Sequence, residues 1–154
     1  MLHLAVNGWP LPKLLVAMIQ DGTWVHPAED RLHELIPFLV DPVVFLVTCE
    51  AMVHESSGRL ADNRRDSRIF HIVSGRKVKA PVELPWLDAD RSVFIAVNRW
   101  PGDDVGIALD YRTDAGDPRV VASDWGSGQG CIWREVVPTF SSFVRLLGLV
   151  RHSP

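Results

Sequence analysis

"RSVFIAVNRWPGDDVGIALDYRTDAGDPRVVASDW", residues 91–125, alternates short apolar runs with breaks rich in turn residues. Three of the runs have the β-branched and aromatic composition of strands: 92–98, 105–111 and 119–123. Gly102 and Gly116 lie in the two breaks, where they permit tight turns and set the strand register. Because parallel neighbours would need connections of about a dozen residues or more, this stretch predicts an antiparallel meander.

Apolar residues at helical spacing lie on both sides of this meander. They predict helices at 11–21, 29–39, 42–55 and 140–148. Gly22 is suited to end the first helix, and Pro37 must kink or end the second because it lacks a backbone donor. Asp41 is the expected N-cap of the third helix. The apolar stripe of that helix is predicted to contain Phe45, Cys49, Met52 and Val53.

The order of helices, strands and a closing helix is that of an α+β domain. Two further strands are predicted at 68–74 and 131–137, and a short one within 2–6. We expect N-terminal helices packed on a central, mostly antiparallel sheet of about five to six strands, closed by a C-terminal helix. The 154 residues predict a single domain. Its parts are a helical region (1–58), a sheet region (59–137) and a terminal helix (138–150).

The composition and the two cysteines indicate in which cellular compartment the protein is expected. A formal net charge of −3 gives no electrostatic reason to expect binding to nucleic acid or to an anionic membrane. The opening "LHLAVNGWPLPK" lacks the pattern of a signal peptide, and no apolar run approaches the length of a membrane span. Cys49 and Cys131 are far apart, which fits two small core side chains in a reducing compartment. We therefore expect a cytoplasmic protein.

Charge is segregated along the chain. Residues 59–79 hold seven of the 16 lysines and arginines, whereas residues 80–125 hold nine carboxylates against four arginines. A solvated hairpin is the simpler interpretation of the basic stretch, because it lacks the interleaved aromatic residues of a nucleic-acid site. Complementary electric fields favour rapid and oriented protein association, so the acidic side is a candidate interface.

Six aspartates lie between Asn98 and Trp125: Asp103, Asp104, Asp110, Asp114, Asp117 and Asp124. Four of them fall in the predicted turns, where aspartate accepts local backbone hydrogen bonds. Asp110 and Asp124 are candidates to face one another across neighbouring strands. A divalent cation needs several oxygens at one point, yet the two turns are expected at opposite ends of one strand. The pattern favours turn residues, no metal site and no cofactor, with a small metal-assisted hydrolase as the alternative.

No other pattern typical of catalysis is present. "WGSGQGC", residues 125–131, matches no nucleophile elbow, P-loop or dinucleotide motif and indicates a loop, although a groove beside it is a candidate ligand site. The six histidines show no metal-ligand spacing. Six tryptophans are a high count, and four of them fall in loops or at element ends: Trp9, Trp86, Trp100 and Trp125. Such residues pack at a core edge or anchor an interface.

The second half of the chain resembles a known group of proteins. Its features are "FIAVN", "GDDVGIALDYR", "DPRVV" and a tryptophan-containing strand leading to a proline and "TFSSFVRLL". In this order, over roughly residues 84–149, they resemble the SUKH superfamily, which contains the yeast Smi/Knr-type cell-wall assembly regulators and many bacterial immunity proteins. The resemblance implies an α+β domain that acts by binding protein, with no shared catalytic residues.

We therefore expect a non-catalytic protein-binding domain, namely an immunity protein that neutralises a cognate bacterial toxin. A regulatory adaptor of the Smi/Knr type is the alternative, and the sequence is also compatible with a homodimer. The expected partner-binding residues combine tryptophan anchors with carboxylates at the rim. They are Trp100, Asp103, Asp104, Asp114, Asp117 and Trp125.

Overall fold

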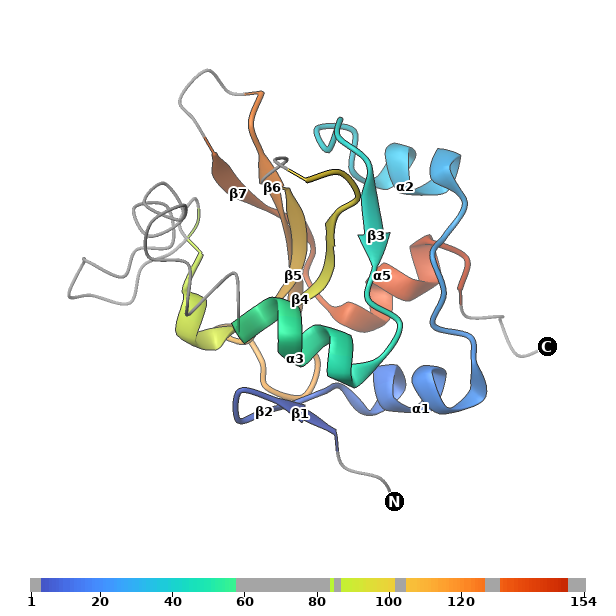
Figure 1. Cartoon of the computed structure of the whole chain (residues 1–154), viewed down its shortest axis with the longest axis vertical. Coiled ribbons are helices and arrows are strands. Elements are labelled where there is room, and N and C mark those ends of the chain that lie inside the picture. The colour runs from blue at the N-terminus through green and yellow to red at the C-terminus, as the bar shows by residue number, and fades with distance from the viewer. Residues whose placement is uncertain (1–3, 58–83, 85–86, 102–104, 127–130, 150–154) are drawn as a thin grey trace.

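The computed structural model describes residues 4–57, 84, 87–101, 105–126 and 131–149 (Figure 1). In chain order the elements are β1 (Ala5–Val6), β2 (Trp9–Pro10), α1 (Lys13–Asp21), α2 (Glu29–Leu35), β3 (Val43–Phe45), α3 (Cys49–Ser57), the 3-10 turn η2 (Ala89–Arg91), β4 (Ser92–Asn98), β5 (Gly106–Asp110), β6 (Arg119–Asp124), β7 (Ile132–Val137) and α5 (Phe140–Leu146). Among these residues, no helix is long and apolar enough to cross a membrane.

The main sheet is antiparallel throughout, with the order β3-β4-β5-β6-β7. This confirms the predicted α+β class and the meander from β4 to β7. β4 is interrupted by a bulge between Phe94 and Ala96. Next to it, the backbone N–H of Phe94 donates to Oγ of the buried Ser56 in α3, at 3.0 Å. The helix thereby satisfies a donor at the point where the strand pairing is irregular. The predicted strand at 68–74 and the turn at Gly102 lie outside the described residues.

The first two helices follow the apolar spacing of the sequence. α1 buries Leu15, Val16 and Met18 and ends at Gly22, whose φ of 79° is the left-handed conformation that glycine adopts readily. α2 ends at Leu35, earlier than the predicted 39, because Pro37 cannot donate the next helical hydrogen bond.

The predicted helix at 42–55 is wrong in its first half. Residues Val43–Phe45 form the edge strand β3, paired with β4, and α3 begins only at Cys49. Asp41 is therefore no helix cap, and Phe45 lies in a strand. The start of α3 is stabilised instead by Thr48, whose Oγ1 accepts from the backbone N–H of Ala51 at 3.1 Å.

A small hairpin replaces the single short strand predicted near the N-terminus. β1 and β2 pair with each other, so the 1–58 region is not purely helical. Asn7 and Gly8, which connect the strands, both have positive φ, at 52° and 84°. An Asn-Gly pair between apolar residues is a strong hairpin signal, which accounts for the second strand that the single predicted strand lacks.

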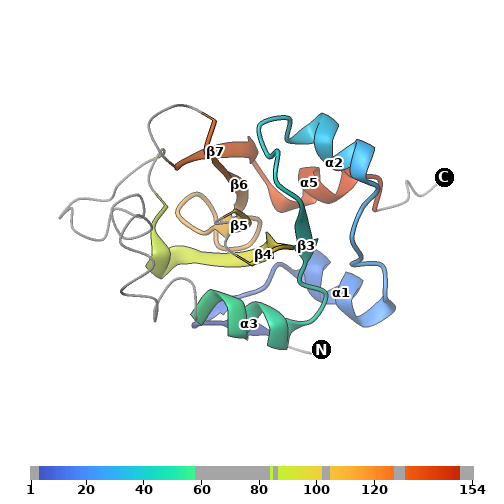
Figure 2. The same cartoon turned by 45° about the horizontal axis from the view of Figure 1, so that its top comes forward.

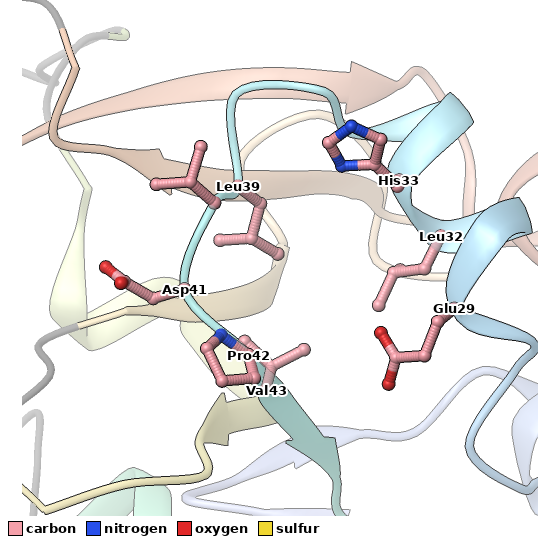
Figure 3. A pocket seen from close by; sticks show the side chains of 8 residues that line it. Glu29, Leu32, His33, Leu39, Asp41, Pro42 and Val43 are labelled. Atoms are coloured by element: carbon pink, nitrogen blue, oxygen red, sulfur yellow. The ribbon is translucent and has the colours of Figure 1, made fainter.

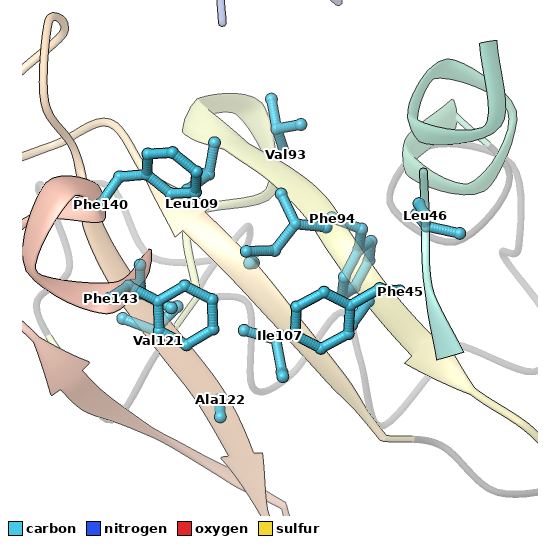
Figure 4. Packing of buried hydrophobic residues seen from close by; sticks show 14 of the residues in the cluster. Phe45, Leu46, Val93, Phe94, Ile107, Leu109, Val121, Ala122, Phe140 and Phe143 are labelled. Atoms are coloured by element: carbon cyan, nitrogen blue, oxygen red, sulfur yellow. The ribbon is translucent and has the colours of Figure 1, made fainter. Parts of the chain in front are cut away.

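The core lies largely between the sheet and its helices. α3 packs beside β4 and α5 beside β6 and β7, so that the central strands run between these two helices (Figures 1 and 2). Figure 4 shows Phe140 and Phe143 of α5 reaching the side chains of the central strands. The ring of Phe143 also stacks on Phe45, with 6.3 Å between centroids. These large buried side chains hold α5 on the sheet.

Candidate functional site

The antiparallel register gives the sheet two distinct ends. At one end Ser92 pairs with Asp110 and Asp110 with Arg119. We call this the Asp110 end. At the other, Val43 pairs with Asn98 and Asp124 pairs with Ile132. This end also carries Trp100, two residues beyond β4, and we call it the Trp100 end.

The expected partner-binding residues divide between these ends. Asp114 and Asp117 lie in the β5–β6 connection at the Asp110 end, whereas Trp100 and Trp125 follow the strands that finish at the Trp100 end. The length of a strand, roughly 17 Å for five residue steps, separates the two groups. Asp103 and Asp104 lie outside the described residues. The described candidates therefore do not form one compact surface.

Asp110 is the centre of a buried ion-pair network. Its side chain is 0% exposed, and its carboxylate accepts from Nε and Nη2 of Arg112 at 2.9 and 2.8 Å. Arg119 approaches the same carboxylate at 2.8 Å through Nη2 and contacts Glu135 at 3.7 Å. Burial by itself would raise the pKa of Asp110, but the hydrogen bonds and charge of Arg112, with the charge of Arg119, hold that pKa below its ordinary value. Asp110 is thus a buried anion that its own chain neutralises.

The N-terminal hairpin packs against this same end. Trp9 stacks on Tyr111 with 5.1 Å between ring centroids, and its Nε1 donates to the backbone oxygen of Asp90 at 2.8 Å. The hydroxyl of Tyr111 donates to the backbone oxygen of Pro10 at 2.8 Å. Burial raises the pKa of Tyr111, which keeps the hydroxyl protonated as a donor. Trp9 therefore packs at the core edge.

Asp114 and Asp117 have local structural partners. Asp114 Oδ1 accepts from the backbone N–H groups of Gly116 and Asp117 at 2.7 and 3.1 Å, as predicted for a turn residue. Asp117 instead accepts from the backbone N–H and the hydroxyl of Ser141 at 3.0 and 2.7 Å. It therefore ties the β5–β6 turn to the first turn of α5, where free backbone donors and the helix dipole favour an anion.

Asp124 lies far from Asp110, which corrects the expectation that these two aspartates face one another. The β5–β6 register pairs Asp110 with Arg119, the first residue of β6, and Asp124 is the last residue of that strand. Its Oδ2 accepts from Nε of Arg134 at 2.6 Å, and its Oδ1 accepts from the backbone N–H of Gly126 at 2.8 Å. Within the described residues, no group of three or more His, Cys, Asp or Glu side chains is arranged to hold a metal ion.

Exposed apolar side chains gather instead along β3. Of the seven large hydrophobic residues that are exposed in the described part of the chain, five lie beside this strand or at the neighbouring end of β4. We name them the β3 margin: Val25, Val40, Val44, Val47 and Trp100. Exposed apolar residues on segments that pair with one another are candidates for a protein-binding surface.

Pairing between β3 and β4 and contacts from the segment before α2 bring the β3 margin together. Val44 pairs with Val97 in β4, and the backbone N–H of Arg99, the residue before Trp100, donates to the oxygen of Pro42 at 3.0 Å. Val25 lies between Trp24, whose Nε1 donates to the oxygen of Leu46, and His26, whose ring contacts Phe45.

Trp100 and Trp125 differ in burial. The side chain of Trp100 is 59% exposed, and the turn that carries it is held by a 2.7 Å hydrogen bond from Nδ2 of Asn98 to the Trp100 backbone oxygen. Trp125 is half-buried and packs against the hydrophobic core. Trp100 is thus the tryptophan that a partner can cover with little rearrangement.

A hollow of about 140 Å³ opens at the corner between α2 and the residues that precede β3. Figure 3 shows Glu29 and Leu32 pointing from α2 toward Pro42 and Val43, with Leu39 along the opposite wall. The side chains of Leu32, Leu39 and Val43 are buried parts of the core, and Val40 at the rim is exposed. We call this cavity the α2–β3 hollow.

Glu29 provides the charge at this hollow. Its Oε1 contacts Nε2 of His26 at 2.7 Å and Nη2 of Arg99 at 3.7 Å. The Glu29 side chain is nevertheless 64% exposed, so both contacts are open to solvent. Asp41 also lines the hollow, but Figure 3 shows its carboxylate turned away from α2. The hollow therefore combines an apolar wall with the exposed imidazole of His33 and the accessible carboxylate of Glu29.

Neither the β3 margin nor the hollow was predicted from the sequence. The run of apolar residues from Val43 to Val47 falls within the predicted helix at 42–55, which would bury one face of the run. Its length of five residues, bounded by Pro42 and Thr48, was a signal for a strand. The closeness of α2 to Pro42 is tertiary and has no local signal.

The chain was compared with family models, with curated proteins and with solved structures, and none of the three comparisons found a match.

Proposed function

We propose that this chain is a non-catalytic protein-binding domain that acts as an immunity protein against a cognate bacterial toxin. The observation that carries the proposal is the β3 margin, a set of exposed apolar residues in or near an edge strand and the neighbouring end of β4 that includes an accessible tryptophan. Such a surface is costly to leave in water and is well suited to burial by a partner. Trp100 is its central anchor, because a large rigid ring buries much area at little entropic cost.

Two further observations support a binding role. The carboxylates of the described acidic tract are engaged by this chain's own arginines and backbone donors, which is the arrangement expected of structural residues. The resemblance of residues 84–149 to the SUKH superfamily supplies the more specific proposal of immunity, since many of its members are bacterial immunity proteins. The interface proposed now is the Trp100 end, in place of a single acidic face that includes Asp114 and Asp117.

The proposal is tested by co-expressing the chain with a candidate toxin, sought among the products of the neighbouring genes, and measuring cell survival. Wild-type chain should restore growth and co-purify with the toxin, whereas Trp100→Ala should weaken the complex by about 2 kcal/mol or more. Trp9→Phe is the matched control, because Trp9 packs against Tyr111 at the other end of the sheet. If the wild-type chain neither protects nor co-purifies, immunity toward that toxin is wrong, and a regulatory adaptor becomes the better proposal.

A further inference from the structure

The α2–β3 hollow has the size of a side-chain site. Its volume of about 140 Å³ is close to that of a cavity of about 150 Å³ that admits a benzene-sized group. Leu32, Leu39 and Val43 form an apolar wall that belongs to the core, so this wall is held rigidly. An occupant would therefore meet a preformed surface and gain contact area without ordering the protein.

The negative charge of Glu29 at the hollow favours a cationic occupant. Glu29 points from α2 toward Pro42 and Val43 (Figure 3). Both of its ion-pair contacts are made by Oε1. A carboxylate has two oxygens and about four acceptor positions, which leaves capacity for a further donor. An anionic occupant would be repelled by Glu29, and a purely apolar one would desolvate that carboxylate without replacing its hydrogen bonds.

Lysine and arginine side chains combine the two required properties. Each has an apolar stem that packs against hydrophobic walls and a cationic head that donates to a carboxylate. We propose that the α2–β3 hollow receives a lysine or arginine side chain of the partner protein, with its stem against Leu32, Leu39 and Val43 and its charge at Glu29. This inference rests on the proposed function, because it names the partner chemistry that the Trp100 end recognises.

Arg99 lies where it would compete with an incoming cation for Glu29. Its guanidinium lies 3.7 Å from Oε1 of Glu29, where it partly neutralises the carboxylate and competes with an incoming cation. Removal of the Arg99 charge should therefore strengthen cation binding, whereas removal of the Glu29 charge should weaken it. A site in which Glu29 serves only the local structure would not show this opposite pair of effects.

Benzamidine is a suitable probe, because it joins a benzene ring to a cationic head. Its neutral analogue benzamide has nearly the same shape. We expect benzamidine, titrated into the full chain and followed by NMR, to shift the signals of Leu32, Leu39 and Val43 saturably, with at least about fivefold higher affinity than benzamide. Glu29→Gln should remove this preference, and Arg99→Gln should increase it.

Glu34→Gln is the matched control, because Glu34 is an exposed carboxylate of the same helix that does not line the hollow. It should leave the benzamidine affinity unchanged. Equal binding of benzamidine and benzamide to the wild-type chain, or no saturable shift at the hollow, would overturn the proposal. Equal losses in Glu29→Gln and Glu34→Gln would also overturn it, because they indicate attraction to the general acidity of α2.

The toxin experiment separates this inference from the proposed function. If the chain protects cells but benzamidine does not bind at the hollow, the proposed occupant is wrong, and the proposal of an immunity function is retained. If benzamidine binds through Glu29 but the toxin is not neutralised, the cation site stands and immunity toward that toxin is wrong. When both succeed, Glu29→Gln should weaken the toxin complex by about fivefold, and Glu34→Gln should not.

Discussion

At the Asp110 end of the sheet, polar groups are satisfied by other groups of this chain: Arg112 and Arg119 neutralise Asp110, and Asp117 holds the first turn of α5. At the Trp100 end, an accessible tryptophan, Val44 of the edge strand and the flanking Val40 and Val47 are exposed to solvent. The contrast teaches that an acidic tract does not identify an interface by its charge. A carboxylate is available to a partner only where it is not already engaged in ion pairs or hydrogen bonds within the chain.

Among the substitutions considered, the largest loss of stability is expected at Asp110. Asp110→Ala removes the buried anion and leaves Arg112 and Arg119 close together without their shared counter-ion. We expect the free energy of unfolding to fall by about 3–5 kcal/mol, measured by denaturant titration. Glu135→Ala is the control, because Glu135 contacts Arg119 from a half-exposed position and should cost less than about 1 kcal/mol. Similar small losses of unfolding free energy in both variants would mean that the Asp110 ion-pair network does not stabilise this end of the sheet.

The same network predicts an acid-sensitive stability. The folded-state pKa of Asp110 lies below its unfolded value, which is about 3.9. The carboxylate therefore stabilises the fold above that unfolded pKa, and the stabilisation is lost as the pH falls through the folded pKa. We expect the difference in unfolding free energy between wild type and Asp110→Asn to shrink between about pH 5 and pH 2. A difference that does not change with pH would contradict the ionised state of Asp110.

Asp117 should give an intermediate effect. Asp117→Ala removes two hydrogen bonds to Ser141 at the start of α5 and should cost about 1–2 kcal/mol of unfolding free energy. Asp117→Asn keeps an acceptor oxygen and should cost less. Thermal unfolding monitored by circular dichroism measures both. An equal loss in the two variants would show that the negative charge, and not the hydrogen bonds, stabilises the helix.

How far the sequence predicted these differences depends on the range of the interactions involved. The strands from β4 to β7 were predictable because their β-branched runs and turn residues are local signals. β3 was not predicted, because a short apolar run such as Val43–Val47 fits either a strand or a buried helix, and its pairing with residues 96–98, about fifty positions later in the chain, decides between them. In the same way, the local turn bonds of Asp114 were predictable, but the contact of Asp117 with Ser141, 24 residues away, was not.

The partner-binding residues were also predictable only where the signal was local. Trp100 was identified from its place between strands, and the structure presents it at the surface. The valines that accompany it belong to segments 25–47, which meet β4 only in the folded chain. Periodicity within one segment cannot show which exposed residues of different segments become neighbours.

The smallest effect on stability is predicted for Trp100. Because Trp100 is 59% exposed, Trp100→Ala should change the free energy of unfolding by no more than about 0.5 kcal/mol. Denaturant titration of the purified variant measures this change. A loss near 2 kcal/mol would place Trp100 in the folded core and remove it as a binding anchor.

The most direct test of the account is the affinity of Trp100→Ala for a toxin that the wild-type chain neutralises, measured by calorimetry on a variant shown to be as stable as the wild type. The account predicts that binding weakens by about 2 kcal/mol or more, roughly thirtyfold, and that protection of toxin-expressing cells is reduced. Unchanged binding by Trp100→Ala, together with a marked loss in an equally stable Asp114 variant, would contradict the account and return the interface to the Asp110 end.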